Sequence, residues 1–404
     1  MTGIDWENAN MDKREAFSFT ENRIKQICAE IAQREDADGC VLLSTCNRTE
    51  LYLSGNAQLD PAKLLCQMAN AEEALPLLKV RRGEQAERHL MRVSCGLQSQ
   101  ILGEDQIVSQ VKRAYQIAHD AGTADAELSQ LFRLAATAGK KSRTQVRLSA
   151  APLSVAGQAV ELITQQMGDL NGKRALVIGN GEMGRLACNL LHARGCDVTV
   201  TLRTYRHGVT IVPAGCHTIA YDDRMKKISD CDILISATTS PHFTVSYHDM
   251  IAMERYPALI CDLSMPRDID PSIHSISEIV CLDMDSMGGR ESYADEQAHS
   301  QVEAIIEEEM NELFRWRSYR EALPVMDELC QLTSERVVTG YDLSQLCSGE
   351  DHETIRKMEA AARLAAEKTA RLLFSGLQGE WEDGALEACR EAILRKAPQL
   401  RDRI

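Results

Sequence analysis

The 404-residue sequence lacks the marks of a membrane, secreted or zinc-binding protein. Its longest apolar runs, such as residues 174–179, stop far short of the ~20 residues that a membrane span needs. The first residues show neither the basic start nor the apolar segment of a signal peptide. The 14 cysteines are scattered, with no Cys-x-x-Cys pair and no Cys/His cluster at zinc spacing. We therefore expect a cytoplasmic protein with reduced thiols, no metal site and no membrane contact.

Positive charge is scarce as well. The chain has 45 basic and 60 acidic residues, which gives a net charge of -15. A general nucleic-acid coat protein would be basic instead, because phosphate contact depends on Lys and Arg. RNA is not excluded, since an acidic protein can dock it through a local basic patch. The composition is otherwise average, which excludes a disordered chain, and at ~150 residues per domain the length predicts two or three domains.

The middle of the chain, residues 172 to about 285, alternates apolar strand-like runs with helical stretches. Residues 185–194 have apolar side chains at helical spacing, with Gly195 as the cap. Strands that alternate with helices predict βαβ units and a parallel sheet. The expected strands are residues 173–178, 197–202, 232–236 and 258–262.

The last part of the chain, from about residue 290, is almost wholly helical. In residues 291–323, apolar side chains recur at steps of three and four. This helix would span ~50 Å, which is typical of a spine or connector, and Pro324 is expected to end it. Further helices follow, including residues 353–374. A helix with one apolar stripe must bury it against something, which favours a role in association.

A glycine motif, Gly179-x-Gly181-x-x-Gly184, directly follows the first strand of the middle region and opens its first helix. The first glycine permits a tight turn, and the second lets the backbone approach a pyrophosphate. The third allows close packing of helix and strand. A plain strand-to-helix turn without a ligand is the alternative. In this context the motif predicts a Rossmann-type dinucleotide-binding domain.

The end of the second strand decides between the two nicotinamide cofactors. NAD-binding proteins usually place an Asp or Glu there to hold the ribose 2′-hydroxyl. This chain has Leu202-Arg203-Thr204-Tyr205-Arg206 instead, and a guanidinium suits the 2′-phosphate of NADP. We therefore expect NADPH, although both arginines could be ordinary exposed charges. The residues expected to hold it are Gly179, Asn180, Gly181, Glu182, Met183, Gly184, Arg203, Thr204 and Arg206.

In residues 40–52, an apolar strand ends in small hydroxyls, a cysteine and an arginine. A nearby cation gives a cysteine thiolate character, and Arg48 is close to Cys46 in the sequence. Arg48 could also pair with a substrate carboxylate as a bidentate fork. Local chemistry alone nevertheless favours a buried, inert cysteine.

A second stretch, residues 87–115, is dense in polar groups. Residues 103–105 could open an amphipathic helix in which Gln106 and Gln110 lie one turn apart on the polar side. They could form hydrogen bonds to a polar substrate, or they could belong to a polar face that only contacts water. His89 could donate a proton near neutral pH, although a lone histidine in a helix is more often structural.

Together these runs resemble glutamyl-tRNA reductase, the first enzyme of the five-carbon route to tetrapyrroles. Ser-Thr-Cys46-Asn-Arg-Thr-Glu-Leu-Tyr is similar to that family's nucleophile motif, and residues 89–112 are similar to its substrate-pocket stretch. The loop that begins at Gly179 matches its NADPH loop, and residues 236–241 and 262–271 have the family's character. The resemblance covers nearly the whole chain.

The resemblance implies an α/β multidomain fold. Residues 1–155 would form an N-terminal α+β catalytic domain that recognises glutamyl-tRNA(Glu). Residues 156–288 would form a Rossmann-type NADPH domain. Residues 289–404 would form a long spinal helix and an all-helical dimerisation domain. The family also implies a V-shaped homodimer joined through the C-terminal helices, and a glutamate-1-semialdehyde aminomutase is a further candidate partner.

The resemblance also implies roles for single residues. Cys46 would be the nucleophile, and His89 would be important for activity. The Cys46 thiolate would attack the ester carbonyl between glutamate and tRNA and form a thioester. Hydride from NADPH would then reduce the thioester, and the resulting hemithioacetal would collapse to glutamate 1-semialdehyde. The residues implied for substrate binding are Thr45, Asn47, Arg48, Ser99, Glu104, Asp105, Gln106 and Gln110.

Some features leave alternatives open. The basic cluster of Lys140, Lys141, Arg143 and Arg147 could contact tRNA phosphates or be a solvated surface cluster. The family usually begins with a strand containing Asn-His-Lys-Thr-Ala, where this chain has Ile4-Asp-Trp-Glu-Asn-Ala-Asn. The chain also has Gln98, Asp105 and Leu202 where the family commonly has Asp, Pro and Asn. A non-catalytic paralogue that binds NADPH or tRNA is therefore one alternative. Another is an NADP oxidoreductase of the shikimate dehydrogenase type, in which Cys46 is inert.

Overall fold

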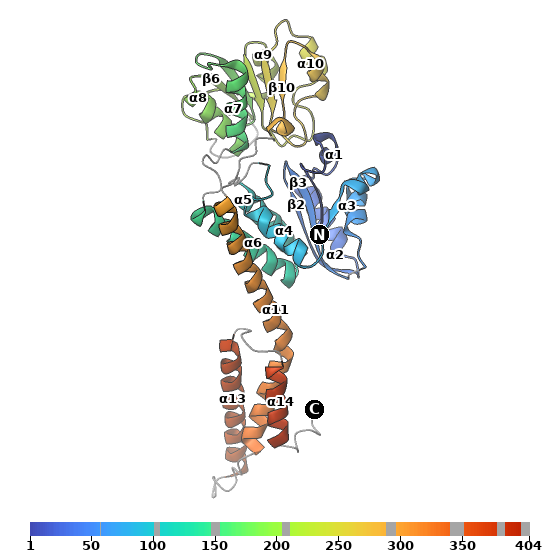
Figure 1. The fold of residues 1–404 in the computed structure, drawn as a ribbon, viewed down its shortest axis with the longest axis vertical. Coiled ribbons are helices and arrows are strands. Elements are labelled where there is room, and N and C mark those ends of the chain that lie inside the picture. The colour runs from blue at the N-terminus through green and yellow to red at the C-terminus, as the bar shows by residue number, and fades with distance from the viewer. Residues whose placement is uncertain are drawn as a thin grey trace. The chain divides into compact units, whose positions relative to one another are not determined.

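The computed structural model describes residues 1–56, 58–100, 106–146, 154–203, 211–287, 296–339, 351–377 and 384–396. The chain divides into two compact units, Met1–Glu307 and Glu308–Ile404. The first unit contains two sheets, drawn in blue and in green to yellow in Figure 1. No helix in the described part of the chain is both long and apolar enough to cross a membrane.

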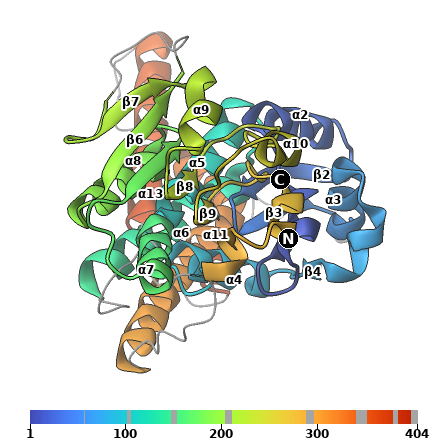
Figure 2. The ribbon, with the colours of Figure 1, turned by 90° about the horizontal axis from the view of Figure 1, so that it is seen from above.

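The first sheet has four antiparallel strands in the order β2-β3-β1-β4. Its strands are β1 (Thr2–Asp5), β2 (Ala37–Ser44), β3 (Arg48–Gly55) and β4 (Lys79–Val80). The opening strand forms despite its unusual sequence, because Ile4 is buried and Thr2 to Asp5 pair with β3. Helices α2 and α3 lie beside this sheet (Figure 2). The helices of this part are α1 (Met11–Glu15), α2 (Glu21–Ala32), α3 (Pro61–Ala69), α4 (Glu84–Ser94), α5 (Ile107–Asp120) and α6 (Ala126–Gln145), with a 3-10 helix at Glu72–Leu77.

The second sheet has six parallel strands in the order β10-β9-β8-β5-β6-β7. All four strands expected in the middle region are present as β5, β6, β8 and β9. The helices are α7 (Val155–Met167), α8 (Glu182–Ala193), α9 (Arg224–Ile228) and α10 (Tyr247–Ile251), and 3-10 helices span Tyr221–Asp223, Pro271–Ser275 and Met284–Met287. The strands are β5 (Arg174–Ile178), β6 (Asp197–Leu202), β7 (His217–Ala220), β8 (Ile233–Ser236), β9 (Leu259–Asp262) and β10 (Val280–Leu282).

Alternation along the central strands explains the three layers of this domain. Ala175 and Val177 of β5 belong to an apolar cluster with α7 and α8. Leu176 and Ile178 face the other way and join a cluster with α9 and α10. Successive side chains of a strand point to opposite faces, so a strand covered on both faces is apolar throughout. The expected Rossmann-type layering is therefore confirmed.

The long helix α11 spans Glu296–Thr339, with Pro324 inside it. The expectation that Pro324 ends the helix is wrong. A proline removes one backbone hydrogen bond and costs ~3 kcal/mol inside a helix. The buried stripe continues beyond it with Met326, Leu329 and Cys330, and their burial outweighs that cost. Two further helices, α13 (His352–Leu377) and α14 (Ala385–Lys396), follow.

Candidate active site

Cys46 lies at the tip of the hairpin that joins β2 to β3. Ser44 and Thr49 are the last paired residues of the two strands. Thr45 closes the turn, because its backbone N–H donates to the Arg48 carbonyl over 2.8 Å. The Thr45 hydroxyl also accepts from the N–H groups of Asn47 and Arg48, each at 3.2 Å. The turn thus holds the thiol on a short, fixed loop.

The environment of this thiol differs from that of the buried cysteines of the core. Cys46 is half-buried, whereas Cys40 on the preceding strand is fully buried. Cys46 packs against the apolar cluster that lies under α7 and α8, together with Met183 and Met265. Met183 is in the first turn of α8. The thiol loop therefore contacts the nucleotide-binding part of the same unit.

Behind the hairpin, one face of β3 carries a buried polar network. Arg48 Nη1 donates to Glu50 Oε1 over 2.8 Å, and Tyr52 donates to Glu50 Oε2 over 2.6 Å. His89 Nε2 of α4 also lies 2.8 Å from Glu50 Oε1. Although burial alone would raise it, the charges of His89 and Arg48 hold the pKa of Glu50 well below its usual range. Burial and the Glu50 charge raise the pKa of Tyr52 well above its usual value.

Arg48, which is expected to bind the substrate, is part of this network. Its side chain is only 2% exposed, and its second terminal nitrogen donates to the backbone carbonyl of Gln98. Both terminal nitrogens are thus engaged within the protein, so the arginine is not an open fork for a substrate carboxylate. Glu50 and Tyr52 of this network were not among the residues expected at the site. The signal was the alternation along the strand, since Arg48, Glu50 and Tyr52 follow one another at steps of two residues and therefore share one face.

Three other residues expected to bind the substrate are described, Ser99 before α5 and Gln106 and Gln110 at its start. Gln106 is its N-cap and Gln110 lies one turn further on, both half-buried. The Ser99 hydroxyl is buried, with no hydrogen-bond partner among the described residues. Such a group favours an external partner, because an unpaired buried hydroxyl is costly. Glu104 and Asp105 lie outside the described residues.

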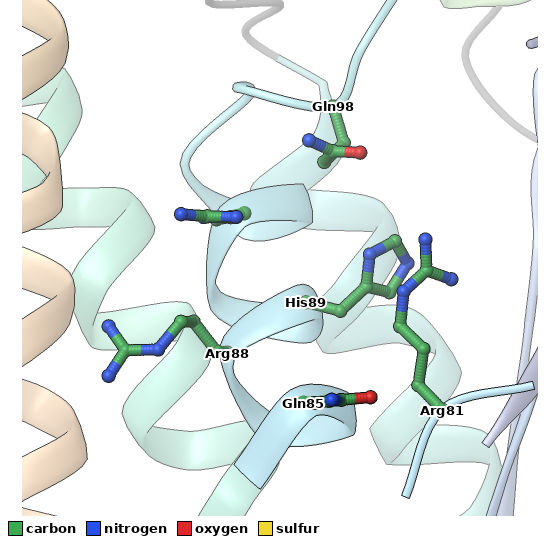
Figure 3. Close-up of a pocket in the computed structure, with 6 residues that line it drawn as sticks. Arg81, Gln85, Arg88, His89 and Gln98 are labelled. Carbon is green, nitrogen blue, oxygen red and sulfur yellow. The ribbon is translucent and has the colours of Figure 1, made fainter.

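A pocket of about 310 Å³ lies along α4 (Figure 3). His89 contributes to its wall, so the pocket borders the buried network behind the thiol hairpin. The described residues that line it are Arg81, Gln85, Arg88, His89, Arg92 and Gln98. A pocket of this size and composition suits a small polar ligand.

The glycine loop after β5 has the geometry that a dinucleotide requires. Gly179 has a φ of +107°, and a Cβ on Gly184 would lie 2.0 Å from the Gly179 carbonyl oxygen. Among the described residues, a Cβ on Gly181 would meet nothing within 4 Å, and no side chain caps the N-terminus of α8. Asn180 Oδ1 is buried without a partner among the described residues. An open, donor-rich helix start of this kind fits a pyrophosphate.

The remaining cofactor residues are only partly described. Glu182 and Met183 are in the first turn of α8. Arg203 follows β6, is exposed, and lies over the Tyr221 ring at 4.8 Å. Thr204 and Arg206 lie outside the described residues. An exposed guanidinium at this strand end is compatible with a 2′-phosphate.

A second polar network closes the carboxyl ends of β8 and β9. Buried Asp268 accepts hydrogen bonds from the hydroxyls of Ser236 and Thr238, each at 2.6 Å. Asp262 accepts from the backbone N–H groups of Asp268 and Ile269, each at 2.9 Å. Ligands of open parallel sheets bind at this edge. These hydrogen bonds fix the loops that follow β8 and β9. The loop after β8 lies beside the glycine loop, since a Cβ on Gly179 would meet the Ala237 carbonyl.

Comparisons with known proteins match two parts of the chain. The profile of the glutamyl-tRNA reductase N-terminal domain matches residues 2–146, and that of shikimate/quinate 5-dehydrogenase matches residues 161–289. A glutamyl-tRNA reductase of Acetivibrio thermocellus is 42% identical over 328 residues, which cover 80% of this chain and 98% of the relative. The chain belongs to the glutamyl-tRNA reductase family. The predicted family, fold class and enzyme class are thereby confirmed.

Two further relatives extend the comparison. A probable multifunctional siroheme biosynthesis protein HemA of Ruminiclostridium josui is 41% identical over 79% of this chain. The chain spans only 62% of that longer relative. The solved glutamyl-tRNA reductase structure from Methanopyrus kandleri is 29% identical, covering 99% of this chain and 98% of that chain, with a TM-score of 0.45. The shikimate dehydrogenase profile covers only the nucleotide-binding part, so it does not make the whole chain an enzyme of that type.

Proposed function

We propose that the chain reduces glutamyl-tRNA(Glu) to glutamate 1-semialdehyde with NADPH, through a thioester on Cys46. This reaction is the first step of tetrapyrrole synthesis by the five-carbon route. The observation that carries the proposal is the position of Cys46. It lies at the tip of a fixed hairpin and packs against the apolar cluster under α7 and α8. An acyl group held on this sulfur would lie beside the part of the unit that suits a dinucleotide.

The first step is acyl transfer. The Cys46 thiolate attacks the ester carbonyl, a carbon–sulfur bond forms, and the carbon–oxygen bond to the tRNA ribose breaks. The departing ribose oxygen takes up a proton, so glutamate remains as a thioester and uncharged tRNA leaves. The hairpin serves this step by orientation, because Thr45 ties the turn on both sides of the thiol. We assign Arg48 to positioning this hairpin through Glu50 and Gln98.

The glutamyl group would be held by polar side chains around the hairpin. Ser99, with its buried hydroxyl, Gln106 and Gln110 supply neutral hydrogen-bonding groups. Thr45 and Asn47 flank the sulfur, and Glu104 and Asp105 complete the proposed set. His89 is assigned to the support of the hairpin, since it binds Glu50 from the opposite side of the network.

The cofactor residues follow from the fit of the glycine loop. The backbone of Gly179 to Gly184, with Asn180, Glu182 and Met183, would hold the pyrophosphate end. Arg203, Thr204 and Arg206 would hold the 2′-phosphate. When bound, NADPH supplies the hydride that reduces the thioester to the aldehyde, which frees the Cys46 thiolate.

Association and RNA contact are part of the proposal. Exposed leucines along α13 favour a homodimer through the C-terminal helices, because several large apolar side chains left in water on one helix usually pack against a partner. These leucines are Leu364, Leu372 and Leu373, at 53%, 74% and 67% exposure. Lys112 of α5 lies close to Lys140 of α6, which together with burial lowers the pKa of Lys112. We assign these two lysines to contact with tRNA phosphates. A cytoplasmic location and an aminomutase partner complete the proposal.

Thioester capture tests the function directly. The protein is mixed with glutamyl-tRNA without NADPH, quenched in acid, and analysed by peptide mass spectrometry. The expected result is one glutamyl group on the peptide that carries Cys46, released by hydroxylamine. Cys46→Ala should abolish it, whereas Cys389→Ala, which removes an exposed thiol of the C-terminal helices, should not. A folded protein without the adduct would favour a non-catalytic paralogue.

A further inference from the structure

The pocket along α4 has an unusual charge for this acidic chain. Three arginines, one histidine and two glutamines line it, and none of the described lining residues is acidic. In Figure 3 the side chains of Arg81 and His89 point toward one another. Gln85 and Gln98 lie at the two ends of the pocket, and Arg88 points away from the others. Such a set of donors suits an anion.

The arginines of the pocket differ in their partners. Arg88 Nη1 binds Glu307 over 2.8 Å, and Arg92 Nε binds Glu303 over 2.8 Å, both on α11. The side chain of Arg81 has no carboxylate within ion-pair distance among the described residues, and it is half-buried. Of the three, Arg81 is thus the arginine whose charge the described chain leaves for a ligand.

The pocket is joined to the thiol hairpin through Gln98. The side chain of Gln98 lines the pocket, and its backbone carbonyl accepts from the second terminal nitrogen of Arg48. Arg48 is two residues from Cys46 and closes the same turn. The indole N–H of Trp6 donates to the same carbonyl over 3.4 Å. A ligand in the pocket therefore lies against the segment that holds the hairpin in place.

We propose that the Arg81 pocket binds phosphate groups of the single-stranded 3′ end of the substrate RNA. This inference rests on the proposed function, since it concerns how the RNA part of the ester is held while the glutamyl group reaches Cys46. A guanidinium pairs with phosphate as a planar fork. Glutamine amides and arginine faces also suit unstacked bases, which are the usual targets of sequence-specific RNA recognition. The volume of about 310 Å³ suits one nucleotide.

Binding of uncharged RNA tests the pocket without catalysis. Fluorescence anisotropy compares an acceptor-stem RNA with its single-stranded 3′ end and the same RNA trimmed to a blunt end. Arg81→Gln should weaken binding of the first RNA about tenfold, the effect of one charge-assisted hydrogen bond. It should also reduce the slope of log affinity against log salt by about 0.7, the value for one phosphate contact on a single strand. The blunt RNA should bind both proteins equally.

Arg34→Gln is the matched control, because it also removes one positive charge. Arg34 is exposed, and Asp36 is its one ion-pair partner in the part of the chain that the structure describes. This variant should bind both RNAs as the parent protein does, and equal melting temperatures of the two variants show that both fold. If Arg81→Gln keeps the parent salt slope, or weakens the blunt RNA equally, the proposal is overturned.

Two further measurements separate the sources of the anion. Thioester formation from a phosphate-free ester, glutamyl-adenosine, should proceed equally with the parent protein and Arg81→Gln. An equal loss with this ester and with glutamyl-tRNA would assign the pocket to the amino acid and overturn the proposal.

Pyrophosphate is the second probe. If Arg81→Gln abolished inhibition by pyrophosphate but left RNA binding unchanged, the pocket would hold a free phosphate compound instead. Failure of thioester formation in every protein would count against the proposed function, while the anisotropy result would still decide the pocket.

Discussion

Glu50→Gln is the substitution that most directly tests the network behind the thiol. The Glu50 side chain is 1% exposed and accepts from Arg48, His89 and Tyr52. Glutamine keeps the size and one carbonyl oxygen but removes the charge, which leaves the Arg48 guanidinium buried without its carboxylate. Removing one partner of a buried ion pair costs about 3–5 kcal/mol. That is a large part of the ~5–15 kcal/mol that stabilises a typical domain.

Urea denaturation followed through one tryptophan measures this cost. The chain has three tryptophans, and Trp6 lies in the N-terminal sheet region, hydrogen-bonded to the Gln98 carbonyl. In a Trp316→Phe/Trp381→Phe background, the fluorescence of Trp6 reports on this region alone. With a urea slope of about 2 kcal/mol per molar, the midpoint should fall by roughly 1.5–2.5 M. Thioester formation should slow as well, since the hairpin loses its support.

A double-mutant comparison isolates the electrostatic cause. Arg48→Met in the Glu50→Gln background removes the uncompensated charge and should restore at least half of the lost free energy of unfolding. The difference between parent and Glu50→Gln should also shrink as pH falls below about 4. The pKa of Glu50 is depressed in the folded chain, so its stabilisation is present above the ordinary carboxyl pKa and is lost in acid. A loss below 1 kcal/mol at pH 7 would refute the assignment of the network.

Two predictions concern the nucleotide-binding part. Gly184→Ala should lower the melting temperature and abolish NADPH binding in calorimetry, because its Cβ would lie 2.0 Å from the Gly179 carbonyl. Gly181→Ala, whose Cβ meets nothing within 4 Å, should fold normally and only weaken NADPH, and equal melting losses would contradict this difference. Burial, followed by the charge of Asp268, raises the pKa of Asp262 to about 7. The folded chain then holds a proton that the unfolded chain releases, so the free energy of unfolding should fall between about pH 4 and pH 7, by at most ~1.4 kcal/mol per unit. Asp268→Asn should flatten this slope in urea titrations, and an unchanged slope would contradict the coupling.

The sequence predicted the nucleotide-binding part well because its signals are local. A parallel strand covered on both faces is a short continuous apolar run, and the glycine motif fixes where the first strand ends and the first helix begins. The predicted strand 197–202 coincides with β6, and the other three differ from the observed strands by one residue. The prediction that the helix ends at Pro324 failed because tertiary packing outweighed a local signal. A local rule ends the helix there, whereas the buried stripe after the proline keeps it intact.

The thiol site could be predicted only in part from the sequence. The motif gives the residue types around Cys46, but it does not give the direction of the Arg48 side chain. Alternation along a strand separates two faces, and it identifies the inner face only when the other face is exposed to water. In β3 both faces are covered, because Thr49 and Leu51 are as buried as Arg48, Glu50 and Tyr52.

The hydrogen-bond partners of Arg48 could therefore not be predicted from the motif alone. Glu50 is in the same motif, but His89 comes from α4 and the Gln98 carbonyl from the segment after it, about 40 and 50 residues further along the chain. An arginine next to a cysteine that is expected to be a nucleophile is readily assigned to the substrate. Here the same charge holds β3, α4 and the segment after α4 together behind the hairpin. The positive charge that we propose for the RNA phosphates comes from Arg81, which the motif does not contain, and Arg81→Gln is therefore the informative variant.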